Sequence, residues 1–193
     1  MILGITGGTG CGKTTLLNLI AEQGGLILDC DAIYHQLLRT DTAMLSAIEA
    51  RFPGTVTQGV LDRKKLGGMV FSDEAALLDL NKITHGAVKQ AVLQALSAQP
   101  ALAAIDAIGL FEGELAPLCQ VTVAVSAPRE ARIARLMERD GITQAYATQR
   151  IDAQKSDQWY AQQCDHVLEN DGTQEQFQEK CLAFLQGLGI IKA

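Results

Sequence analysis

The sequence predicts an α/β protein with three layers (α/β/α), in which helices flank a parallel sheet of five strands. Two observations predict this class. Short apolar runs of strand length alternate with longer segments whose apolar residues recur at helical spacing. In addition, the first run turns through a glycine-rich segment directly into a helix. The expected strands are residues 1–5, 26–28, 101–106, 121–125 and 166–168.

The glycine-rich segment, residues 7–14, reads GGTGCGKT and matches the pattern G-x-x-x-x-G-K-[ST]. In this pattern the backbone N–H groups and the helix dipole converge on one point, where phosphate oxygens bind. Lys13 is expected to reach the β- and γ-phosphates, and the Thr14 hydroxyl to join a Mg²⁺ shell. The segment therefore predicts a site for a nucleoside triphosphate with Mg²⁺.

Two acids, Asp29 and Asp31, follow the second expected strand, at the sheet edge where ligands of open α/β sheets bind. In extended chain they would face the same way, and one of them could orient or deprotonate an attacking hydroxyl. We prefer Asp31 for this role. The alternative is that both acids only cap the helix expected at residues 32–38.

The middle of the chain is predicted to be mostly helical. A helix is expected at 42–52, a polar connector at 55–59, and then several helices between Asp62 and residue 98, with breaks near Ser72 or Asp73 and after Leu80. This amount of helix between two strands exceeds a simple crossover. It indicates a lobe inserted on the sheet, suited to binding an acceptor.

The later expected strands carry further candidates. Asp106 ends the third strand and could hold the metal through water. After Pro128, a helix carries Arg132, Arg135 and Arg139 on one face. Such a stripe is either a solvated surface or a mobile lid that neutralises charge during transfer. Further helices are expected at 143–153, 156–164 and 173–185.

Composition limits the remaining possibilities. The 193 residues suit one domain, and the net charge of −6 without a basic block argues against nucleic-acid binding. No signal peptide and no span of membrane length is visible, so we expect a cytoplasmic protein without membrane contact, monomeric or weakly homo-oligomeric. Five scattered cysteines favour reduced thiols, with Cys11 exposed beside the phosphates.

Together these motifs resemble the dephospho-CoA kinase family along nearly the whole chain. The resemblance is carried by the ordered set TGGTGCGKTT (6–15), DCD (29–31), LNKITH (80–85), RLMERDG (135–141), RIDAQ (150–154) and DHVLEN (165–170). The chain departs from the family pattern at Gly86, where proline is usual, and at residues 108–112, which lack a Pro-Leu-Leu run.

The resemblance implies a P-loop kinase fold: a core of residues 1–58, 100–128 and 164–193, a helical acceptor-binding lobe at 59–99, and a helical lid at 129–163. It implies ATP and Mg²⁺ as cofactors and dephospho-CoA as the substrate, phosphorylated on its ribose 3′-hydroxyl. The implied catalytic residues are Asp31, Lys13 and Arg139. The implied ATP-binding residues are Gly8, Thr9, Gly10, Cys11, Gly12, Lys13, Thr14, Thr15, Arg135 and Asn170. The implied substrate-binding residues are Asp29, Asp31, Arg63, His85 and Glu112, and the metal site is Thr14 with Asp106 through water.

Two alternatives remain open at this point: a kinase of another small acceptor, such as a nucleoside or nucleotide, and an ATP-binding regulator without kinase activity. A GTPase switch is disfavoured because the segments resembling D-x-x-G (106–109) and N-K-x-D (81–84) occur in the wrong order, and the second lacks its acid.

Overall fold

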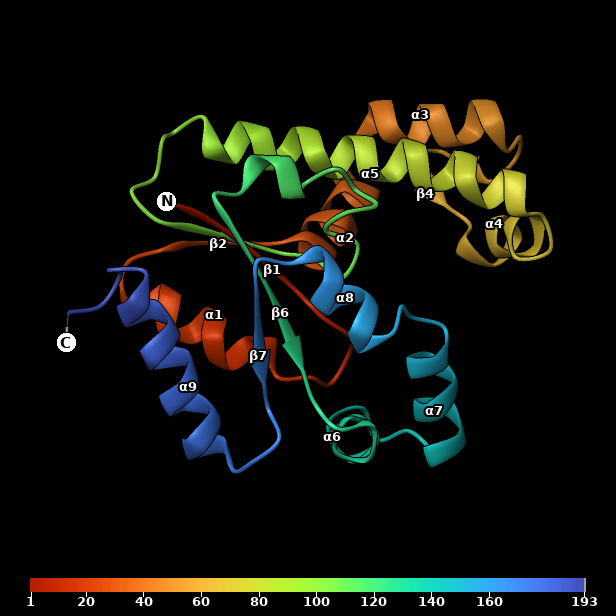
Figure 1. Cartoon of the computed structure of the whole chain (residues 1–193). Helices are drawn as coiled ribbons and strands as arrows, with labels where there is room; N and C mark the ends of the chain where they lie inside the picture. Colours follow the sequence, from red (N-terminus) through yellow and green to blue (C-terminus); the bar gives the residue numbers. More distant parts are fainter. Residues whose placement is uncertain (193) are drawn as a thin grey trace. The chain divides into compact units, whose positions relative to one another are not determined.

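The computed structural model describes residues 1–192 and divides into two compact units (Figure 1). The sheet unit comprises residues 1–28, 100–110 and 115–192, and the helical unit comprises residues 29–99 and 111–114.

The sheet unit is built on the predicted five-stranded sheet, in the order β2-β5-β1-β6-β7. β1 pairs in parallel with β5 and β6, and β6 pairs in parallel with β7. The strands are β1 (Ile2–Thr6), β2 (Leu26–Asp29), β5 (Ala103–Asp106), β6 (Val121–Ser126) and β7 (His166–Glu169). β1 is buried along almost its whole length, which explains its continuous apolar run. The α/β class and the parallel sheet are confirmed.

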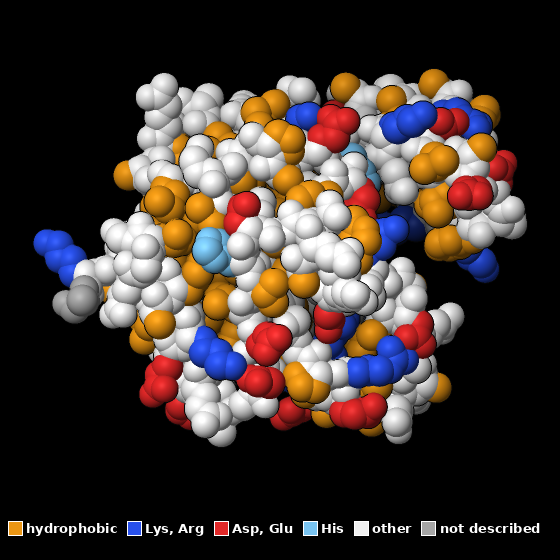
Figure 2. Space-filling model, in the orientation of Figure 1, with side chains coloured by type: hydrophobic (Ala, Val, Ile, Leu, Met, Phe, Trp, Pro, Cys, Tyr) orange, Lys and Arg blue, Asp and Glu red, His pale blue; other side chains and the backbone are white. Residues whose placement is uncertain are grey.

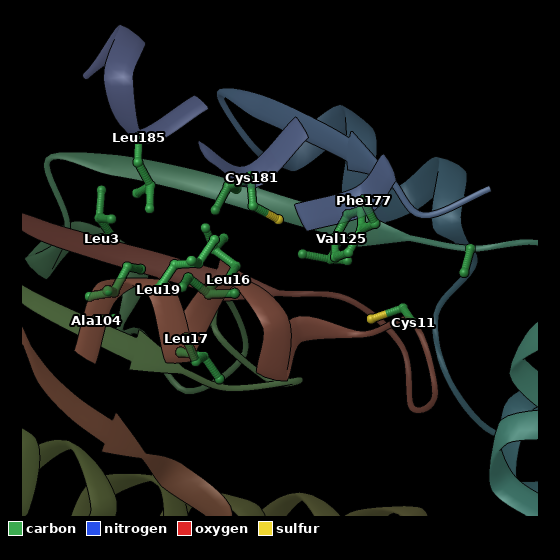
Figure 3. Close-up of a cluster of buried hydrophobic side chains, with 14 residues drawn as sticks. Leu3, Cys11, Leu16, Leu17, Leu19, Ala104, Val125, Phe177, Cys181 and Leu185 are labelled. Atoms are coloured by element: carbon green, nitrogen blue, oxygen red, sulfur yellow. The ribbon is translucent and has the colours of Figure 1, made fainter. Parts of the chain in front are cut away.

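Two helices cover one face of this sheet: α1 (Lys13–Glu22) and α9 (Gln174–Gly187) lie side by side (Figure 1). Figure 3 shows their apolar side chains packed with those of the central strands, for example Leu16 and Phe177 beside Val125. A capping box at Thr173 and Gln176 fixes the start of α9. This packing holds the N-terminal end of α1 in place, and that end carries the phosphate loop.

Three helices precede β7: α6 (Arg129–Asp140), α7 (Gln144–Asp152) and α8 (Asp157–Gln163). A short 3₁₀ helix, η1 (Ala116–Leu118), which the sequence did not predict, precedes β6. α6 ends at Gly141 in a left-handed conformation, with φ of 64°. Ile133 and Leu136 of α6 pack with Ala147 and Ile151 of α7 in a separate apolar cluster, so these helices have their own small core.

The helical unit contains α2 (Cys30–Thr40), α3 (Thr42–Arg51), α4 (Arg63–Val70) and α5 (Glu74–Leu96). Aspartates cap all four: Asp29, Asp41, Asp62 and Asp73 each accept a hydrogen bond from the backbone N–H three residues later. The predicted cap at Asp62 is therefore confirmed, and of the two candidates Ser72 and Asp73 it is Asp73 that caps α5.

Two expectations for this unit were wrong. The expected connector at 55–59 belongs to a hairpin of β3 (Val56–Thr57) and β4 (Val60–Leu61). Gln58 and Gly59 both have positive φ, as a two-residue hairpin turn requires, but Gln-Gly is a weaker sequence signal than Asn-Gly. Secondly, α5 is one helix of 23 residues and does not break after Leu80. Packing of its buried residues, Thr84 and Val88 among them, outweighs the low helix propensity of this part of the sequence.

The boundaries of the units differ from those implied by the family pattern. Residues 29–58, which we expected in the core, group with the helical unit. The reason is a shared apolar cluster: Leu38 of α2 and Ile48 of α3 pack with Leu66 and Val70 of α4 and with Ala76 of α5. The role of each segment as core, lobe or lid remains a prediction.

Charged side chains of both signs are interspersed over the face drawn in Figure 2. Among residues 1–192, no helix combines the length and the apolar character that crossing a bilayer requires.

Candidate active site

The phosphate loop, residues 7–12, connects the end of β1 to the first turn of α1. Gly12 occupies the N-cap of α1 in a left-handed conformation, with φ of 100°, and the Asn170 side-chain amide lies where a Cβ would project. Only glycine fits both conditions. The backbone N–H groups at the start of a ten-residue helix are thus directed into one region, as the sequence predicts for phosphate binding.

Lys13 lies between the loop and the neighbouring strand. Its Nζ donates a hydrogen bond of 3.1 Å to the Gly7 carbonyl and lies 3.8 Å from Oδ1 of Asp106. Asp106 is brought there by register, because it pairs with Ile5 at the end of β5. The predicted phosphate-binding lysine and the predicted metal-side acid therefore lie together, and Thr14 follows with an exposed side chain.

Arg135 and Asn170 reach the same loop from other elements. Arg135 Nη1 donates to the Gly10 carbonyl at 3.1 Å and to the Cys11 carbonyl at 3.4 Å, and its Nη2 donates to Asn170 Oδ1 at 3.2 Å. Asn170 Nδ2 in turn donates to the Cys11 carbonyl at 2.9 Å. Both residues were predicted to bind the nucleotide; the structure places them on the loop's carbonyl side, where they fix its shape.

Arg132 and Gln154 also hold the loop, and the sequence did not assign them to the site. Arg132 is buried, with 4% of its surface exposed, and its Nε donates to the Thr9 carbonyl at 2.9 Å. Gln154 Oε1 accepts from the Thr9 N–H at 2.9 Å. The periodicity of the arginine stripe was the available signal for Arg132, and for Gln154 it was membership of the RIDAQ motif, which did not indicate a contact with the loop.

Arg139 is the member of the stripe that does not contact the loop. It is bound by its neighbour Asp140 through hydrogen bonds of 2.7 and 3.1 Å, and Arg150 donates to the same carboxylate at 2.6 Å. The hydrogen bonds from Arg139 and then from Arg150 lower the pKa of Asp140 to about 2. The stripe thus separates into two arginines on the loop and one that is mostly solvent-exposed.

Cys11 corrects another expectation. We expected its thiol to be exposed beside the phosphates, but the side chain is buried in the core beneath the loop (Figure 3). Burial raises the pKa of this thiol, despite the opposing effect of nearby Lys13. Only the backbone of Cys11 is available to a ligand, which argues against ready oxidation at this position.

Asp29, the last residue of β2, and Asp31 have different environments in the helical unit. Asp29 accepts a hydrogen bond of 2.9 Å from the Ala32 N–H and is the N-cap of α2. Asp31 lies in the first turn of α2 with an exposed side chain. The expected extended arrangement is wrong, because the helix begins at Cys30. The capping alternative holds for Asp29 and leaves Asp31 as the candidate base.

The remaining substrate candidates also lie in the helical unit. His85 of α5 and Glu112 line one cavity of about 330 Å³, together with Asn81 and Lys89. Arg63, at the start of α4, lies 3.4 Å from His35 Nδ1 of α2 and is not among the residues that line this cavity. The unit thus brings His85 and Glu112 together, whereas the structure records no contact of Arg63 with them.

Comparisons with known protein families, sequences and structures agree on one family. The sequence model of dephospho-CoA kinase matches residues 1–176. A dephospho-CoA kinase of Latilactobacillus sakei is 34% identical over 191 residues, which cover 96% of this chain and 95% of the relative. A solved structure from Thermus thermophilus has a TM-score of 0.83 at 30% identity and covers 97% of both chains. A dephospho-CoA kinase from Campylobacter jejuni shares the fold, with a TM-score of 0.67 at 23% identity over 97% of this chain and 96% of that one.

Proposed function

We propose, from the premise that this chain belongs to the dephospho-CoA kinase family, that it transfers the γ-phosphoryl group of ATP to the ribose 3′-hydroxyl of dephospho-CoA. This reaction is the last step of coenzyme A biosynthesis, and the products are ADP and coenzyme A.

One observation in the sheet unit carries the proposal. The phosphate loop, Lys13 and Asp106 converge at the carboxyl edge of β1 and β5. Phosphoryl transfer depends mainly on positioning and on neutralising charge, because its loose transition state requires little covalent assistance. The N–H groups at the start of α1 and the Lys13 ammonium supply both, and hydrogen bonds from Arg135 and Asn170 hold the loop rigid.

The residues present also suit Mg²⁺. No cluster of three or more His, Cys, Asp or Glu side chains suited to a metal ion occurs in residues 1–192. None is needed, since Mg²⁺ is usually held by one or two protein oxygens, with substrate phosphates and water completing the shell. We assign these oxygens to Thr14 and, through water, to Asp106. The ion would neutralise charge on the β- and γ-phosphates.

On the acceptor side we assign Asp31 the role of general base. Its carboxylate is exposed in the first turn of α2 and is not used as the cap, so it can accept the hydroxyl proton. Asp29, Arg63, His85 and Glu112 are assigned to acceptor binding. Arg139 is assigned to charge neutralisation during transfer; its bond to Asp140 must exchange for one to phosphate.

An acceptor panel tests the proposal. ADP release from ATP and Mg²⁺ is measured with dephospho-CoA, adenosine, AMP, shikimate and no acceptor. We expect strong stimulation by dephospho-CoA alone. Stimulation by a nucleoside or nucleotide would assign a different acceptor, and tight ATP binding without any stimulation would indicate a regulator.

A further inference from the structure

Thr9, in the middle of the phosphate loop, has both of its backbone polar groups bound by side chains from residues 129–163. Its N–H donates to Gln154 Oε1 at 2.9 Å, and its carbonyl accepts from Arg132 Nε at 2.9 Å. These two side chains also contact each other, since Arg132 Nη2 donates to Gln154 Oε1 at 3.1 Å. The peptide groups on either side of one loop residue are thus held by a connected pair.

The pair is anchored by an acid at the start of α8. Arg132 Nη1 lies 2.9 Å from Asp157 Oδ1, so all three nitrogens of the guanidinium have an oxygen partner. The Arg132 side chain is 5% exposed and that of Asp157 is 35% exposed. A rigid planar guanidinium can satisfy three separated oxygens at once, whereas an ammonium cannot reproduce this arrangement.

Two glycines of the loop leave room for this arginine. The guanidinium of Arg132 lies where a Cβ at Gly8 would project, and the Arg132 backbone lies close to Gly10. A side chain at Gly8 would therefore displace the arginine. The geometry joins α6, the turn after α7 and the start of α8 to the loop at one point.

We infer that Arg132 and Gln154 form a clamp on Thr9 that fixes the phosphate loop in its transfer geometry, with Arg132 as a positioning residue that acts through the loop. The kinetic part of this inference rests on the proposed function. The clamp itself does not. The N–H groups at the start of α1 and Lys13 lie outside the clamp, so its loss is expected to affect transfer more than ATP binding.

The clamp is tested by hydrogen exchange of the Thr9 amide, followed by NMR in ¹⁵N-labelled protein. In Arg132→Met and in Gln154→Leu, exchange is expected to become about tenfold faster, the factor for losing one hydrogen bond of typical strength. Gln154→Glu retains an oxygen acceptor and is expected to restore protection. Arg132→Lys retains the charge but not the planar fork, and is expected to resemble Arg132→Met. Exchange at the wild-type rate in Arg132→Met and Gln154→Leu would overturn the clamp.

Arg129→Met is the matched control. Arg129 lies on the same helix and pairs with Asp152 of α7 at 2.6 Å, but it is half-exposed and its pair does not involve the loop. This variant is expected to leave Thr9 exchange and turnover unchanged, with thermal unfolding confirming that all variants are folded. Equal acceleration of exchange in Arg129→Met would show general loosening of the helices and would overturn the specific clamp.

Kinetics test the positioning role. Arg132→Met is expected to lower kcat about ten- to a hundredfold, as small displacements of reacting groups do, with KM for ATP within about threefold of wild type. Faster Thr9 exchange with unchanged kcat would overturn the positioning role. If wild type does not phosphorylate dephospho-CoA, the proposed function fails, while the exchange result still decides whether the clamp exists.

Discussion

Nζ of Lys13 lies 3.8 Å from Oδ1 of Asp106, at the edge of the sheet where β1 enters the phosphate loop. The two residues are far apart in sequence and meet because β5 pairs in register with β1. An ammonium beside a carboxylate at the mouth of a phosphate loop matches the needs of a bound triphosphate and its metal ion.

Replacing Lys13 with alanine is expected to lower kcat by about a hundredfold or more, because it removes a positive charge from the phosphates during transfer. Initial rates of ADP release at saturating substrates measure the effect. Lys65→Ala is the control, since Lys65 is exposed in the helical unit and its Nζ donates to the Gly54 carbonyl at 2.7 Å. Near-normal turnover in Lys13→Ala would contradict the assignment.

Asp31→Asn is expected to bind ATP normally and to lose about a hundredfold or more in turnover, because an amide cannot accept the hydroxyl proton. Isothermal titration gives binding, and steady-state rates give turnover. Asp41→Asn makes the same change at the N-cap of α3, where asparagine caps equally well, and should have little effect. Normal turnover in Asp31→Asn would refute the base assignment.

The phosphate loop shows which parts of the site the sequence can predict and which it cannot. The pattern predicted the loop and Lys13 because glycine spacing and the strand-to-helix turn are local properties. Arg132 and Gln154 were missed as loop partners, since a buried arginine and a turn glutamine acquire their role only from tertiary contacts.

Asp29 and the hairpin show that the boundaries of helices and strands were harder to predict from the sequence than their type. We expected an extended chain through Asp31, but α2 begins at Cys30. Asp29 and Asp31 therefore do not face the same way, as they would in a strand. Likewise, the polar composition of residues 55–59 suggested a connector, but the turn at Gln58 and Gly59 joins two paired strands in a hairpin. Boundaries of elements depend on backbone conformation at single residues, which propensity specifies weakly.

Arg139→Ala is expected to slow phosphoryl transfer more than it weakens ATP binding, because its guanidinium is assigned to the transition state and not to the bound nucleotide. Comparison of kcat with the ATP dissociation constant measures the difference. Arg129→Ala, on the same helix, is the control. A defect confined to ATP binding would remove the lid argument.

Asp140 predicts a pH effect on stability. Hydrogen bonds from Arg139 and Arg150 lower its folded-state pKa to about 2, below the ~3.9 of an unfolded aspartate. The carboxylate therefore contributes stability above about pH 4, and this contribution falls as the pH drops towards 2. Urea unfolding of wild type and Asp140→Asn should give a free-energy difference that is constant from pH 7 to 5 and shrinks at pH 3.

The effect is expected to be small because the pair is on the surface. The double variant Arg139→Met, Arg150→Met serves as the control, since it removes both donors. In that background the free-energy change caused by Asp140→Asn should not depend on pH in this way. A difference that persists unchanged at pH 3 in the wild-type background would contradict the role of the two arginines.

The position of the transferred phosphoryl group tests the central claim most directly. The product formed from ATP, Mg²⁺ and dephospho-CoA is analysed by ³¹P NMR and compared with authentic coenzyme A, with Lys13→Ala as the inactive control. We predict a new phosphomonoester on the ribose 3′-oxygen, formed in step with ADP. A phosphoryl group on another atom, or ADP formed without any phosphorylated acceptor, would contradict the account.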